Sequence, residues 1–214
     1  MKNIIAKTFT TILIGMVAFL DAQTINRYGT TTANFLEIGV GSRATSMGDA
    51  YVAVANDVSS IYWNPAGLAH VTRSSALFSI QPWLVDIDMM FAGGAFVVPS
   101  LGVIGLGITH LDYGEMDVTN LQYQDGTGER FGASDVAATF TFSRKIVSWF
   151  SFGSSMKYIS SKIWHSSASA FAVDLGVLVN TNFFSFTGKD KDGMNIGMSI
   201  SNYGTRMKYD GIDN

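Results

Sequence analysis

The sequence predicts an all-β protein: an antiparallel transmembrane β-barrel, partial in this chain, preceded by a small N-terminal segment of short helices and irregular structure. Three observations predict this class. Apolar residues alternate with small or polar ones from Ser74 onward. An uncharged run follows the first lysines, as in export signals. Only 14% of the residues are charged, well below the usual ~25%.

Composition excludes several classes of protein. The 214 residues contain no cysteine, which removes disulfides, thiol catalysis and thiolate metal sites. The formal net charge of −3 argues against a basic nucleic-acid interface. Apolar residues make up 47% of the chain, so a disordered protein is excluded as well.

The first residues have the pattern of a secretory signal peptide. Lys2 and Lys7 form a positive region, and residues 8–20 are uncharged and largely apolar. Ala22 supplies a small residue at the expected cleavage point. The apolar run is short of the ~20 residues that a membrane helix needs. We therefore predict a signal peptide over residues 1–22.

Residues 23–73 differ in composition from everything that follows them. This stretch is rich in Ala, Ser, Thr and Gly. Asp57 or Ser59 can cap a short helix that ends near Trp63, because Pro65 lacks an N–H and disfavours a helical conformation at the residue before it. We predict a compact segment with short helices.

Residues 74–214 read as about seven or eight antiparallel strands. One strand shows the pattern clearly, with Phe171, Val173, Leu175, Val177 and Val179 alternating with small or polar residues. Asp-Gly pairs at 125–126, 192–193 and 210–211 are typical of turns. The uncharged run 89–108 has the length of a membrane helix, but Pro99 and five glycines favour two strands joined at Pro99-Ser100.

In the predicted strands, the composition of the face opposite the apolar one favours a membrane protein over a soluble fold. That face carries mostly Gly, Ala, Ser and Thr, whereas a water-exposed face would carry more Lys and Glu. Trp83, Trp149 and Trp164 lie near strand ends, as in the aromatic girdles of outer-membrane barrels. A secreted β-sandwich remains an alternative, and it requires the Phe171–Val179 face to be covered by a second sheet.

Two blocks of the sequence carry a family resemblance. The stretch 39–57 (GVGSRATSMGDAYVAVAND) and the stretch 62–68 (YWNPAGL) together resemble the N-terminal block of the PorV/PorQ family. Further matches are Gly126–Glu129 with Phe131–Asp135, and Lys162–His165 with Phe171–Gly176. The chain is more distantly similar to FadL-type fatty-acid channels, which share an Asn-Pro-Ala motif in their plug.

The resemblance implies an outer-membrane barrel plugged from within by an N-terminal hatch, which in this chain is residues 23–73. It also implies a role in type IX secretion, in which PorV receives cargo proteins through their C-terminal domains. The chain ends in a polar, turn-like stretch at 209–214 rather than in a strand with a terminal aromatic residue. We therefore expect a fragment truncated at its C-terminus, with too few strands to close a barrel.

Two groups of residues are candidate sites. The hatch motif is interpreted as a structural corner, with a ligand role left open because plug segments border the lumen; it comprises Trp63, Asn64, Pro65, Ala66 and Gly67. Lys157 and Asp174 lie opposite the apolar face of their strands, so in a barrel they are lumen charges that pair or line a path.

No catalytic, metal or cofactor site is predicted. Gly39–Ala44 has the form of a dinucleotide fingerprint but lacks the long helix and parallel strand that the fingerprint needs. His70, His110 and His165 are too far apart in sequence for a metal motif. Asp190–Gly193 is better explained as a hairpin turn than as a calcium loop.

The sequence therefore predicts a non-enzymatic outer-membrane β-barrel of the PorV/PorQ type that acts in type IX-like protein secretion or surface anchoring. Its expected partners are outer-membrane lipid and secreted cargo proteins or other secretion-system components, and not nucleic acid. The alternative is a FadL-like passive channel for hydrophobic small molecules, which needs an apolar pocket behind the hatch.

Overall fold

The computed structural model describes residues 32–187 and 193–210. The predicted signal peptide, the Asp190–Asp192 turn and residues 211–214 lie outside the described residues. No helix within the described part of the chain is long and apolar enough to cross a membrane.

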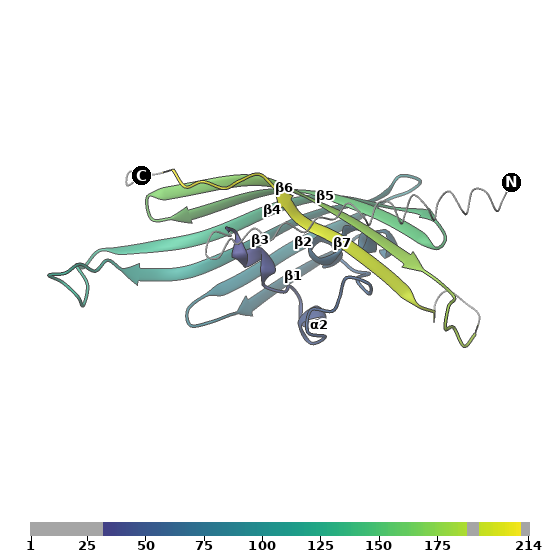
Figure 1. The fold of residues 1–214 in the computed structure, drawn as a ribbon, viewed down its shortest axis with the longest axis horizontal. Coiled ribbons are helices and arrows are strands. Elements are labelled where there is room, and N and C mark those ends of the chain that lie inside the picture. Colours follow the sequence, from purple (N-terminus) through teal and green to yellow (C-terminus); the bar gives the residue numbers. More distant parts are fainter. Residues whose placement is uncertain (1–31, 188–192, 211–214) are drawn as a thin grey trace, which may run out of the picture. The chain divides into compact units, whose positions relative to one another are not determined.

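The described residues form one seven-stranded antiparallel sheet in which each strand pairs with the next along the chain (Figure 1). The predicted fold class is thus confirmed, and β1 and β7 are the two edges of an open sheet. The strands are β1 (Ser75–Pro82), β2 (Asp88–Val98), β3 (Gly102–Asp117), β4 (Arg130–Val147), β5 (Phe150–Ile163), β6 (Ser166–Asn180) and β7 (Asn195–Gly204).

The uncharged run 89–108 forms a hairpin, as its proline and glycines predict. Strands β2 and β3 pair from Asp88 opposite Asp112 to Val98 opposite Gly102. The turn between them places Ser100 at a φ of 67°. Two strands therefore account for a run whose length alone would suit a membrane helix.

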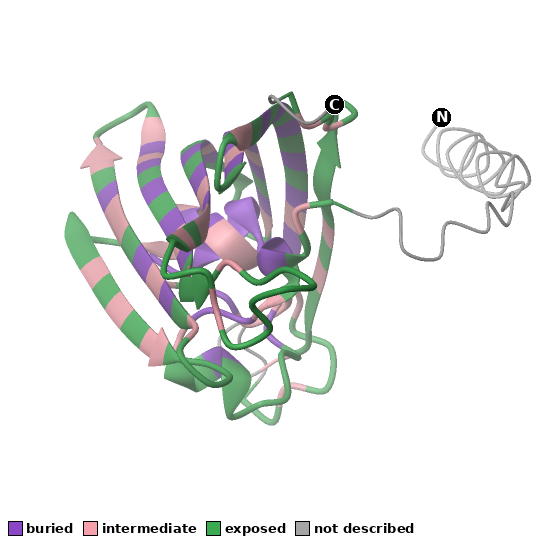
Figure 2. Ribbon diagram, turned by 90° about the vertical axis from the view of Figure 1, so that its left-hand side faces the viewer, coloured by how far each residue is buried: buried purple, intermediate pink, exposed green. Residues whose placement is uncertain are grey.

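Burial along the strands is the reverse of that in a soluble protein. Phe171 is 61% exposed, whereas Thr141, Ser143 and Ser151 are fully buried. Figure 2 shows this as alternating buried and exposed bands across neighbouring strands. The β-sandwich alternative is contradicted for the described residues, because no second sheet covers the Phe171 face.

The exposed apolar residues form a band across the sheet, bounded at one side by a polar row. In that row Asp88, Asp112, Ser134 and Lys162 are successive cross-strand neighbours. Along β5, the apolar outward positions run from Phe150 to Tyr158. The eight residue-to-residue steps between them span about 27 Å of strand, or about 20 Å across a membrane at the usual barrel tilt of roughly 40°. This height approaches the ~25 Å apolar band of outer-membrane barrels.

Two of the four short helices that precede the strands, α3 (Ser60–Trp63) and η2 (Pro65–His70), contact the inward face of this sheet. The inward side chains of the sheet and the helices share one hydrophobic core, in which Phe35, Ile61 and Leu68 pack with Met89 and Phe91. We call residues 33–73 the hatch. Its helices are η1 (Asn34–Glu37), α2 (Ser42–Thr45), α3 (Ser60–Trp63) and η2 (Pro65–His70).

Glycines on the inward face let the hatch backbone touch the sheet. A Cβ on Gly153 would overlap the carbonyl group of Pro65, and a Cβ on Gly176 would overlap the Asn64 Oδ1. Any side chain at these two positions would lift η2 off β5 and β6. The small residues that the sequence shows on this face are therefore a docking requirement.

Gly176→Ala should weaken hatch docking. The added methyl group has no space beside Asn64, so we expect a loss of about 2 kcal/mol in the free energy of unfolding, typical of overpacking. Gly132→Ala is the matched control, because its Cβ would meet only the Gly114 carbonyl oxygen at 3.7 Å. On a gel, a folded outer-membrane barrel runs at a different position from the unfolded chain. The temperature at which heating removes this heat-modifiable band measures the stability of both variants. Equal unfolding temperatures for the two variants would contradict a tightly docked hatch.

Candidate functional site

The chain turns sharply between α3 and η2, at the motif that the sequence singles out. α3 ends at Trp63 because Asn64 adopts an extended conformation with φ −158°. Pro65 then takes the first position of η2, where its missing N–H costs nothing. The Asn64 Oδ1 accepts a hydrogen bond of 3.1 Å from the Ala66 N–H and so caps η2.

Asn64 also connects the corner to the rest of the molecule. Its Nδ2 donates to the Val52 carbonyl at 2.8 Å and to the Val177 carbonyl at 3.2 Å. The first bond holds a hatch loop and the second holds β6. Because Asn64 is fully buried, each of these bonds replaces one that water would otherwise make.

The two aromatic residues before Asn64 form hydrogen bonds with the N-terminal part of the hatch. The Trp63 Nε1 donates to the Val40 carbonyl at 2.9 Å. The Tyr62 hydroxyl lies 2.6 Å from the Leu36 carbonyl oxygen and 2.8 Å from that of Ile38. Burial raises the pKa of Tyr62 above its usual value, so its hydroxyl stays protonated and remains a donor.

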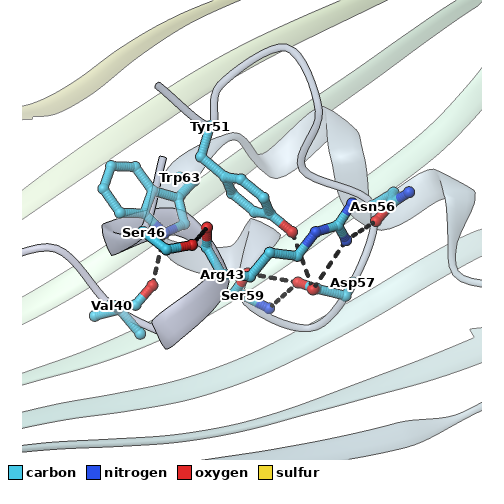
Figure 3. A network of polar contacts seen from close by, with 8 residues as sticks. All are labelled: Val40, Arg43, Ser46, Tyr51, Asn56, Asp57, Ser59 and Trp63. Atoms are coloured by element: carbon cyan, nitrogen blue, oxygen red, sulfur yellow. Dashed lines mark hydrogen bonds and ion pairs between the residues drawn. The ribbon is translucent and has the colours of Figure 1, made fainter. Parts of the chain in front are cut away.

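A partly exposed polar network around Asp57 joins several segments of the hatch (Figure 3). The Arg43 guanidinium donates to the Asn56 side chain at 3.0 Å and lies 3.9 Å from the Asp57 carboxylate. Tyr51 donates to the same carboxylate at 3.1 Å, and burial together with Asp57 raises the pKa of Tyr51. Asp57 also accepts from the Ser59 N–H at 2.9 Å, so Asp57 rather than the Ser59 side chain orders the start of α3.

Lys157 and Asp174 form a buried ion pair beneath the hatch. Their Nζ and Oδ2 atoms are 2.8 Å apart, and the side chains are 3% and 1% exposed. The Lys157 Nζ also donates to the Asn202 Oδ1 at 2.8 Å, while the Asn202 N–H donates to the Asp174 Oδ1 at 2.7 Å. The Lys157 ammonium lies 6.0 Å from the centre of the Tyr62 ring, which links the pair to the hatch.

Two further contacts between the hatch and the sheet could not be predicted from the sequence. Ser143 donates to the Ala66 carbonyl at 3.3 Å, and the Ser151 hydroxyl lies 3.1 Å from the His70 Nε2. Burial, with a smaller effect of Lys145, lowers the pKa of His70, so the ring is neutral near pH 7. Together with the Asn64 bond to Val177, these contacts tie η2 to three strands, β4, β5 and β6.

The three histidines lie in different elements. His70 ends η2, His110 is on β3 and His165 is in the β5–β6 turn, where its ring stacks on Trp164. In residues 32–187 and 193–210, no group of three or more His, Asp or Glu residues is arranged to hold a metal ion.

The Trp63–Gly67 corner thus fixes the N-terminal helices to the inward face of the sheet. The family described as "Type IX secretion system protein PorV" matches residues 21–214. The chain belongs to the PorV family. No curated protein matches it. PorV proteins are outer-membrane proteins associated with type IX secretion, and the Trp63–Gly67 corner lies within the matched region.

Removal of only one partner of the ion pair should destabilise this PorV-family chain. Lys157→Met leaves the Asp174 carboxylate buried without a counter-ion, and we expect a loss of about 3–5 kcal/mol in the free energy of unfolding. The single variant Asp174→Leu leaves the Lys157 ammonium without its counter-ion and should also lose stability. The double variant Lys157→Met/Asp174→Leu removes both charges and should recover most of either loss. Urea unfolding in detergent measures the three variants. A double variant that loses the sum of the two single losses would contradict the coupling.

Proposed function

We propose that this chain is a non-enzymatic outer-membrane component of type IX secretion, in protein export or surface anchoring, that works through its loops and rim while the hatch stays closed. The observation that carries this proposal is the fixed docking of the Trp63–Gly67 corner. Asn64 joins the hatch to β6 with directional hydrogen bonds, and two glycines of the sheet leave no gap beneath η2.

The polar groups beneath the hatch are engaged in holding it. Ser143 bonds the Ala66 carbonyl, and Ser151 pairs with His70. Lys157 and Asp174 neutralise each other. This arrangement supports a plug more than a reaction centre, because the groups that could act on a substrate already bond the protein itself.

A passive channel for hydrophobic molecules has less support. Such a channel needs an apolar passage behind the hatch, whereas the sheet there presents Thr141, Ser143, Ser151 and the ion pair. A hollow of about 810 Å³ lined by apolar side chains does occur, but residues of the outward face such as Phe140, Met156 and Phe171 line it. That face lies on the lipid side of the sheet.

Linking the hatch to the barrel tests the proposal. The chain has no cysteine, so His70→Cys/Ser151→Cys places the only two thiols at a contact between η2 and β5. A short bifunctional thiol reagent then fixes the hatch in place. We expect cells that depend on this variant to export type IX cargo at the same rate with and without the link.

The two single-cysteine variants, treated with the same reagent, control for modification alone. Export that stops only when the link forms would show that the hatch must move, and would overturn the proposal. Uptake of a fatty acid into liposomes that the link abolishes would favour the channel. Normal cargo export by a strain that lacks the chain would also contradict the proposed function.

A further inference from the structure

The β3–β4 hairpin continues well past the apolar band of the sheet. The polar row that bounds the band crosses this hairpin at Asp112 and Ser134, which are cross-strand partners. After a register shift, pairing resumes at Glu115 opposite Gly132 and ends at Asp117 opposite Arg130. Figure 1 shows the hairpin projecting beyond its neighbouring strands. We call residues 113–133 the arm.

The arm has an ordered structure of its own. The Arg130 Nη1 lies 2.8 Å from the Glu115 Oε2, and its Nε lies 3.1 Å from the Asp117 Oδ1. Above these ion pairs the Val118 N–H donates to the Glu129 carbonyl at 2.9 Å, and the Thr127 N–H donates to the Val118 carbonyl at 2.8 Å. Such a loop loses little conformational entropy when a partner binds it.

The tip of the arm exposes two large apolar side chains. Leu121 is 95% exposed and Tyr123 is 60% exposed. The backbone of this tip is ordered, because the Asn120 Oδ1 accepts from the Gln122 and Tyr123 N–H groups at 2.9 and 2.8 Å. Leu121 and Tyr123 lie beyond the polar row that bounds the apolar band, so the bilayer interior does not cover them. Solvent-exposed Leu and Tyr side chains on an ordered loop are typical of a contact site.

Acidic residues surround this tip. The arm contains four acids, Glu115, Asp117, Asp125 and Glu129, and only one base, Arg130, for a net charge of −3. At the base of the arm Asp88 and Asp112 face each other across β2 and β3, although like charges in that position are unfavourable. The arm and its base therefore carry an excess of negative charge.

We propose that the arm docks onto a basic partner protein, with Leu121 and Tyr123 in an apolar pocket and Asp125 and Glu129, the two acids that form no ion pair with Arg130, facing lysines or arginines around it. The charge argues against two other occupants. Anionic lipid headgroups repel an acidic arm, and the same end of a second copy of this chain carries the same acids. The inference rests on the proposed function, since it names the surface through which the rim acts.

Photo-crosslinking in intact outer membranes tests the arm. A benzoyl-phenylalanine placed at Leu121 of the full chain should form an adduct with a protein whose crosslinked peptide has a net positive charge. The same residue at Leu101, an exposed leucine in the turn at the opposite end of the sheet, should not form this adduct.

Charge reversal on the arm gives the sharper readout. Asp125→Lys/Glu129→Lys changes two acids that form no ion pair with Arg130, and it should lower the adduct yield about tenfold through lost electrostatic attraction. Glu37→Lys, the same change on the exposed side of η1, should leave the yield unchanged. The heat-modifiable band verifies that each variant is folded, and Asp125→Asn/Glu129→Gln replaces the reversal if that band is lost.

The outcomes separate this inference from the proposed function. An adduct with lipid or with a second copy of the chain overturns the inference, as does an unchanged yield after charge reversal or no adduct at Leu121. If cargo export still depends on the chain in those cases, the proposed function stands and the arm alone is excluded.

Discussion

The structure depends on the close fit between the Trp63–Gly67 corner and a sheet face that has no side chains at Gly153 and Gly176. With η2 against the sheet, the inward hydroxyl groups find partners and the hatch core packs on β2. Without that fit, Ser143 would lose its bond to Ala66, Ser151 would lose its bond to His70, and the apolar hatch residues would be uncovered. The fit therefore decides which face of each strand is covered by the hatch and which is left exposed.

The buried charges follow from the same fit. Lys157 and Asp174 are tolerable at a few per cent exposure because each has a second polar partner in Asn202. Tyr62 lies over the ammonium group and anchors the first hatch turns through its hydroxyl. The ion pair and the hatch thus stabilise each other.

Much of the fold could be predicted from sequence because its determinants are local. The period of two identifies the outward face of β6 correctly, and Pro65 identifies the end of α3. The bonds of Asn202 to the ion pair could not be predicted. They depend on a register shift between β6 and β7 and on the φ of 58° that Asn202 adopts. The tight turn at Trp164 (φ 50°) lacks glycine, and Asp125-Gly126 lies in the longer arm loop instead. The arm also escapes prediction, because alternation does not reveal where lipid ends.

The central claim is that the large side chains of the sheet face lipid while the small ones lie under the hatch. A nitroxide scan along β6 in proteoliposomes, from Ser169 to Val179, tests it most directly. Labels at Phe171, Val173 and Leu175 should relax strongly with oxygen and weakly with an aqueous nickel complex. Labels at Ala170 and Ala172 should respond weakly to both. Outward positions that respond to nickel, or to neither reagent, would contradict the account.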